Sequence, residues 1–123
     1  MNEDPELGEL LDILSDEYAR DILAATSLEP MSAQQLADQC EMSKPTAYRR
    51  IEQLQSYGLL EEQTKVETST NNYSVYVASL TGVDISLAEG QFEATVSRTD
   101  ADQFPGQEES DTADRFTKMW ENL

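Results

Sequence analysis

The chain has 123 residues with 25 acidic and 8 basic side chains, a formal net charge of −17, one cysteine and no histidine. A single cysteine excludes an intramolecular disulfide, and without histidine a conventional soft-metal site within one chain is nearly excluded. No stretch approaches the ~18 apolar residues of a membrane-spanning helix, and the acidic N-terminus lacks the features of a secretory signal. We therefore expect one domain with a modest core, located in the cytoplasm.

The charges are distributed unevenly along the chain. Residues 1–30 contain nine acidic side chains and one arginine, whereas residues 42–58 contain three basic side chains and one glutamate. A positive segment in a strongly acidic protein indicates a polyanionic partner. Acidic residues elsewhere repel DNA at ordinary salt, but near molar salt the Debye length falls to about 3 Å. Because lysine is also scarce, the pattern favours a protein of a halophilic cytoplasm.

Two helices are predicted in the N-terminal part of the chain. The first spans residues 5–14, and its leucines share one side: Leu7, Leu10, Leu11 and Leu14. The second begins after Ser15, its expected N-cap, and ends at residues 28–30. Its apolar stripe consists of Ala19, Ile22, Leu23 and Thr26.

Residues 32–60 show the pattern of a helix-turn-helix. Ser32 is a good N-cap, and Gln35 three residues later completes a capping box. The first helix has one apolar side, formed by Leu36, Ala37 and Cys40. A turn at residues 41–42 leads to a second helix, which Gly58 terminates.

The second helix of this unit carries the main functional indication. With its apolar positions Ala47, Ile51 and Leu54 facing inward, arginine and glutamine side chains face outward. Their forked donors and acceptors match guanine and adenine edges in the major groove, and the helix start suits phosphate contacts. The residues predicted to contact DNA here are Ser43, Lys44, Pro45, Thr46, Tyr48, Arg49, Arg50 and Gln53. Alternatively, Arg49 and Arg50 belong to an ordinary solvated helix face.

Two hairpins are predicted after this unit. Strands over residues 59–67 and 73–80 flank a polar turn and form a wing, from which Lys65 and Asn71 are expected to reach DNA. The alternative is a simple surface hairpin. Residues 81–99 form an additional hairpin that turns at residues 89–90.

The C-terminal part is divided into a loose acidic linker, residues 100–109, and a helix, residues 110–123. A helix this short is marginal alone, so its apolar stripe needs a cover. We favour a symmetric homodimer over packing against the chain's own domain, because two copies read a palindrome. The predicted dimerisation residues are Leu7, Leu10, Leu11, Phe116, Met119, Trp120 and Leu123.

Residues 7–80 resemble the winged-helix regulators of the ArsR-like and PadR-like groups. The resemblance rests on residues 21–23, 35–37, 43–51 and 57–60, and on Tyr76 in the wing. With its acidity and predicted C-terminal helix, the chain is similar to members from halophilic archaea that respond to reactive oxygen species. The resemblance implies transcription regulation in an oxidative stress response. Glu41 stands where a glycine is usual, and the paired cysteines or histidines of metal-sensing members are missing.

Cys40 has two interpretations. Its place in an apolar stripe favours a buried small hydrophobic residue. An oxidation switch needs an exposed thiolate with a positive neighbour, whereas Glu41 next to it is negative. An oxidant response therefore need not involve Cys40.

These observations predict a mostly α fold with a β wing, in the α+β class: a winged helix-turn-helix over residues 1–80 with an extra hairpin and a C-terminal dimerisation helix. We expect a homodimeric transcription regulator that binds a pseudo-palindromic operator in double-stranded DNA at high salt. No cofactor is expected, but K⁺ or other cations are expected to bind weakly at the DNA interface. The alternative is an acidic winged-helix module that binds a protein and not DNA. An enzyme is disfavoured, because no nucleophile has a base nearby.

Overall fold

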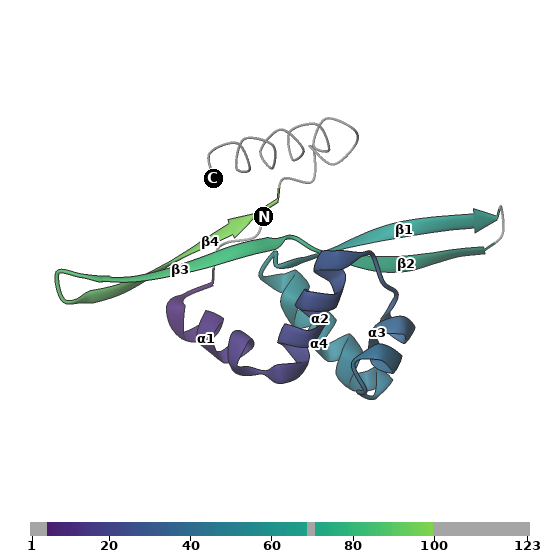
Figure 1. The fold of residues 1–123 in the computed structure, drawn as a ribbon, viewed down its shortest axis with the longest axis horizontal. Helices are drawn as coiled ribbons and strands as arrows, with labels where there is room; N and C mark the ends of the chain where they lie inside the picture. Colours follow the sequence, from purple (N-terminus) through teal and green to yellow (C-terminus); the bar gives the residue numbers. More distant parts are fainter. Residues whose placement is uncertain (1–4, 69–70, 100–123) are drawn as a thin grey trace, which may run out of the picture.

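The computed structural model describes residues 5–68 and 71–99. Four helices are followed by four strands (Figure 1): α1 (Leu7–Ser15), α2 (Glu17–Leu28), α3 (Ala33–Gln39), α4 (Lys44–Ser56), β1 (Leu60–Thr68), β2 (Asn71–Ala78), β3 (Leu80–Ala88) and β4 (Gln91–Arg98). This is the predicted α+β winged helix-turn-helix. The predicted linker and C-terminal helix lie outside the described residues.

The junction between α1 and α2 differs from the prediction in its cap. Ser15 is the last residue of α1, and its hydroxyl donates to the Asp12 carbonyl at 2.8 Å. Asp16 is extended and caps α2, because its Oδ2 accepts from the Ala19 backbone N–H at 2.8 Å. The prediction of Ser15 as the cap was therefore wrong, since a one-residue junction leaves Ser15 inside the preceding helix.

The core forms where the four helices meet the inner ends of both hairpins. All the apolar positions predicted for α2 and α4 are buried: Ala19, Ile22, Leu23, Thr26, Ala47, Ile51 and Leu54. Leu10 is also completely buried. Since Leu10 and Ile13 face the core, Leu10 cannot serve the dimer contact predicted for it, whereas Leu7 is half-buried and Leu11 is exposed.

The helix-turn-helix is held by local hydrogen bonds that the sequence predicted. Ser32 and Gln35 form the expected capping box: the Ser32 hydroxyl accepts from the Gln35 N–H at 3.2 Å, and the Ser32 N–H donates to Gln35 Oε1 at 2.8 Å. The turn passes through Glu41 at φ 54°, and α4 ends before Gly58 at φ 71°. Both positions need a left-handed backbone, which glycine adopts at little cost and glutamate with some strain.

Two antiparallel hairpins extend in opposite directions from the helices (Figure 1), as separate two-stranded sheets. In β1–β2, the wing, Leu60 pairs with Ala78 at the inner end and Val66 with Asn72 near the tip. In β3–β4, Leu80 pairs with Arg98 at the inner end and Ala88 with Gln91 at the tip. The second hairpin turns at residues 89–90, as predicted, with both φ angles positive, which matches the twist of the strands.

The end of α4 is fastened to the second hairpin. Arg98, the last residue of β4, donates from Nε to the Gly58 carbonyl at 2.9 Å and from Nη2 to the Tyr57 carbonyl at 2.8 Å. The Ser79 hydroxyl, between β2 and β3, also donates to the Gly58 carbonyl at 2.8 Å. The carbonyls of the two residues that follow α4 are thus hydrogen-bonded by residues far along the chain.

Candidate nucleic-acid interface

The start of α4 is built by a local cap. The Ser43 hydroxyl accepts from the Thr46 N–H at 3.2 Å and lies 2.9 Å from the Thr46 hydroxyl. Pro45 occupies the first turn, where no N–H is needed. The first turn of α4 contains no acidic residue, so the positive end of the helix dipole is not neutralised locally. This end of the helix favours an anion.

The outer face of α4 presents most of the predicted contact residues to solvent. Those with exposed side chains are Ser43, Lys44, Pro45, Tyr48, Arg49 and Gln53. Thr46 is half-buried and its hydroxyl is already paired with Ser43. Within the described part of the chain, Arg49 makes no hydrogen bond or ion pair. Arg49 is therefore the arginine of this helix whose guanidinium is available to a partner.

Arg50 has a different position from the one expected. Its guanidinium binds Asp16 through two hydrogen bonds, Nε to Oδ2 at 2.7 Å and Nη2 to Oδ1 at 3.1 Å, with both side chains 28% exposed. The hydrogen bond from Arg50 lowers the pKa of Asp16, against the raising effect of burial. The same hydrogen bond raises the pKa of Arg50. Arg50 thus fastens α4 to the start of α2, a contact that the sequence analysis did not predict.

The wing places its predicted contact residues on opposite strands. Lys65 is exposed on β1 and makes no hydrogen bond or ion pair within residues 5–68 and 71–99. Asn71, at the start of β2, is exposed and donates to Glu67 Oε1 at 3.5 Å. Glu62, three residues before Lys65 on β1, accepts from the Ser74 hydroxyl and from Gln55 Nε2 at 3.3 Å. Lys65 therefore shares its strand with two glutamates, Glu62 and Glu67, that accept hydrogen bonds from other residues of the chain.

A hollow of about 460 Å³ lies between α3, α4 and the wing. Its lining is rich in hydroxyl and amide groups and comprises Ser32, Ala33, Gln34, Tyr48, Tyr73, Ser74 and Tyr76. Except for Tyr48, sequence reasoning missed these residues as contacts. The position of Ser32 beside the helix-turn-helix could have been predicted, because Ser32 caps its first helix. The approach of β2 to this helix could not be predicted from the sequence.

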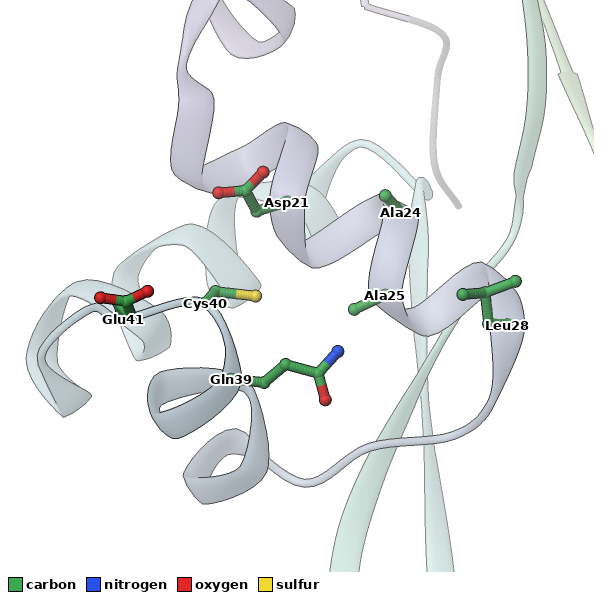
Figure 2. A pocket seen from close by; sticks show the side chains of 7 residues that line it. All are labelled: Asp21, Ala24, Ala25, Leu28, Gln39, Cys40 and Glu41. Carbon is green, nitrogen blue, oxygen red and sulfur yellow. The ribbon is translucent and has the colours of Figure 1, made fainter.

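Cys40 lines a second hollow, of about 390 Å³, between α2 and the end of α3 (Figure 2). Cys40 is half-buried and packs against the core, and its sulfur points toward α2, which carries Asp21 (Figure 2). Burial, and secondarily the charge of Asp21, raise the pKa of the thiol. This environment suppresses the thiolate, in line with the interpretation of Cys40 as a packing residue.

Other kinds of site were also considered. In the part of the chain that the structure describes, no three of the residue types Cys, Asp and Glu come together as potential metal ligands. Among the same residues, none of the helices combines the length and apolarity that crossing a bilayer requires.

The chain was compared with protein families, curated proteins and solved structures. Residues 14–63 match the family model described as a helix-turn-helix domain, which spans α2 to the start of β1. No curated protein sequence matches the chain. Among solved structures, the chain is similar to an ArsR-like transcriptional regulator from Rhodococcus sp. RHA1, with 21% identity and a TM-score of 0.48 over 94% of this chain and 81% of that one.

Proposed function

We propose that this protein is a sequence-specific DNA-binding transcription regulator that acts as a homodimer on a pseudo-palindromic operator. The observation that carries the proposal is the exposed outer face of α4, where Arg49 has no described partner within the chain. A helix-turn-helix domain presents this helix to the major groove. Arg49 and Gln53, one turn apart on α4, are the side chains proposed to read bases.

Contacts with the DNA backbone are proposed to rely largely on neutral donors. The hollow beside α4 brings together hydroxyls of Ser32, Tyr48 and Tyr73. Hydroxyls and amides bind phosphate oxygens without adding positive charge, which suits a chain with a net charge of −17. Lys44 at the start of α4, together with Lys65 and Asn71 on the wing, completes this set.

Electrostatics lead us to propose cation binding at the interface in a halophilic cytoplasm. Basic proteins release counterions on binding DNA, so that log affinity falls with log salt at a slope of about −0.9 per neutralised phosphate. Glu52, Glu61 and Glu67 lie on α4 or the wing and face repulsion from phosphates. Hydrated K⁺ between such carboxylates and phosphates makes the slope flat or positive.

An oxidative stress response is proposed on the resemblance to oxidant-responsive regulators. The surroundings of Cys40 do not favour its thiolate, so the proposal does not depend on oxidation of Cys40. Measurement of transcript changes at the bound promoters, with and without peroxide, tests this part.

The central test is binding of the full chain to duplexes of its own promoter region in molar KCl. Arg49→Gln is expected to weaken binding by roughly 5- to 150-fold, the value of one good base contact, and to relax preference at one base pair. Arg20→Gln is the matched control: it removes the same charge from α2, where the guanidinium contacts the Leu14 carbonyl. Equal loss from both variants, or a steep fall of affinity with KCl, contradicts the proposal.

The acidity of the chain supports a second candidate, a module that binds a basic protein through its surface carboxylates. Such binding weakens as salt screens the attraction. It also persists in Arg49→Gln, since the acidic surface is unchanged. Failure of the wild-type protein to bind any promoter duplex in strong KCl favours this candidate.

A further inference from the structure

The two hairpins differ in the character of their exposed ends. In the wing, residues 62–67 are all exposed, and Val66 is the apolar residue among them. In β3–β4, residues 84–93 are all exposed as well, but they include Ile85, Leu87 and Phe92, with exposed fractions of 45%, 62% and 62%. The polar end of the wing is stable when exposed to solvent. The second hairpin instead exposes an apolar surface, whose burial by a partner is favourable.

The strand register gathers these apolar residues on one face. Val83 pairs with Val96, Ile85 with Ala94, and Leu87 with Phe92. Residues paired across an antiparallel hairpin share a face, so these three pairs form one continuous stripe, which we call the apolar stripe. The intervening pairs Asp84–Thr95, Ser86–Glu93 and Ala88–Gln91 occupy the other face.

Only the inner end of the apolar stripe is covered within the described chain. Val96 is buried, and Val83 and Ala94 pack against the core cluster. The outer residues Ile85, Leu87 and Phe92 are exposed, and the hairpin extends away from the helices (Figure 1). An isolated two-stranded hairpin is marginally stable in water and needs packing on one face. The stripe is therefore an apolar surface that continues beyond the core formed by residues 5–68 and 71–99.

We propose that a second copy of this chain docks on the apolar stripe, so that the β3–β4 hairpin forms the centre of the dimer interface. This inference rests on the homodimer in the proposed function and locates its contact surface. Of the leucines on α1 that were predicted as dimer contacts, Leu10 is buried in the core and Leu11 is exposed.

The chemistry of the stripe favours a second copy over a different protein. None of its six residues is charged or polar, so it offers nothing that would select a basic partner. Identical apolar stripes are complementary to each other under two-fold symmetry. Asp84 and Glu93 are exposed on the other face of the hairpin, and Glu89 is exposed at its turn. Repulsion between these carboxylates in two copies is screened near molar salt.

The size of the stripe fits the centre of an interface. Phe92, at 62% exposure, presents on the order of 120 Å² of apolar surface if an aromatic side chain buries about 200 Å². A stable interface buries about 800 Å² per partner around an apolar centre with a polar rim. The apolar stripe supplies the apolar centre of such an interface.

The location of the stripe is also compatible with DNA binding. The wing and the β3–β4 hairpin point in opposite directions (Figure 1). Docking at the apolar stripe thus leaves the wing uncovered and places the partner copy on the side of the chain opposite the wing. Arg98, at the base of the hairpin, contacts the carbonyls that follow α4, so the interface is joined directly to the end of the reading helix.

The first experiment compares two double variants of the full chain by sedimentation velocity in molar KCl. Leu87→Thr with Phe92→Thr removes the outermost apolar pair, while Ala88→Thr with Gln91→Thr changes the neighbouring pair on the opposite face. We expect the first to raise the dimer dissociation constant by about 100-fold or more and the second to leave it unchanged. A dimer as tight as wild type in the first variant overturns the proposal.

A second measurement needs no substitution and covers the case in which the first variant does not fold. Hydrogen exchange of the wild-type chain is followed above and below the concentration at which it dissociates. We expect amides of residues 84–93 to gain protection only in the dimer. Protection that is independent of concentration assigns the stripe to residues 110–123 of the same chain, and dimer protection elsewhere assigns the interface elsewhere; either result overturns the proposal.

These outcomes separate this inference from the proposed function. A wild-type dimer that uses another face contradicts the docking at the apolar stripe and leaves a dimeric regulator intact. If the wild-type protein never dimerises but Arg49→Gln still abolishes promoter binding, the proposal of DNA binding through α4 is supported. In that case both proposals that involve a dimer fail.

Discussion

The guanidinium of Arg50 holds the carboxylate of Asp16 across 34 positions of sequence, with Nε–Oδ2 at 2.7 Å and Nη2–Oδ1 at 3.1 Å. Asp16 also caps α2 through the Ala19 N–H. One carboxylate thus joins the start of α2 to the middle of α4.

Substitutions at this ion pair are expected to be unequal. Arg50→Ala removes a partly exposed pair, which contributes about 1 kcal/mol or less. Asp16→Ala removes the pair and also the N-cap, which contributes about a further 1 kcal/mol. Denaturant unfolding of both variants and of the double variant measures the coupling. A larger loss of stability in Arg50→Ala than in Asp16→Ala would contradict this assignment.

The ion pair also predicts a dependence of stability on acid. Arg50 lowers the pKa of Asp16 in the folded chain, so its contribution is complete above the unfolded pKa of about 3.9. The contribution is lost as pH falls through the lower, folded pKa. Asp16→Asn keeps a cap acceptor but has no charge. We expect the difference in unfolding free energy between wild type and Asp16→Asn to shrink below pH ~4, and a constant difference would exclude the mechanism.

Arg98 is expected to stabilise the end of α4. Arg98→Ala leaves the part-buried carbonyls of Tyr57 and Gly58 without these donors, which costs about 1–3 kcal/mol. Arg98→Lys restores one donor and should recover part of the loss. Thermal unfolding by circular dichroism measures both variants. No change in stability for Arg98→Ala would mean that water replaces the guanidinium at no cost.

Cys40 is expected to be a slow nucleophile. Burial and the charge of Asp21 raise the pKa of its thiol, which lowers the thiolate fraction at neutral pH. Alkylation of the folded chain by iodoacetamide at pH 7 should be several-fold slower than that of the denatured chain. Cys40→Ser should retain promoter binding. Alkylation that is faster in the folded chain would restore Cys40 as a candidate sensor.

Local features of the fold were predictable from sequence. The capping box of Ser32 and Gln35, the cap at Ser43, the left-handed Gly58 and the turn at residues 89–90 were all expected, and the structure contains them. Each depends on neighbours within a few positions, where backbone stereochemistry and hydrogen-bond geometry leave few alternatives. The inward stripe of α4 was predictable for the same reason, because helical periodicity alone places Ala47, Ile51 and Leu54 on one side.

Other features depended on how these elements pack together. Arg49 and Arg50 are adjacent and chemically identical in sequence, yet Asp16 engages Arg50, while Arg49 has no partner in residues 5–68 and 71–99. Leu10 and Leu11 are also adjacent and identical, yet Leu10 is buried in the core and Leu11 is exposed to solvent. Periodicity defines a face, but the docking angle of one helix on another decides which edge of that face is covered. The hydroxyls around Tyr48 and the exposed apolar stripe of β3–β4 likewise arise only when distant elements come together in space.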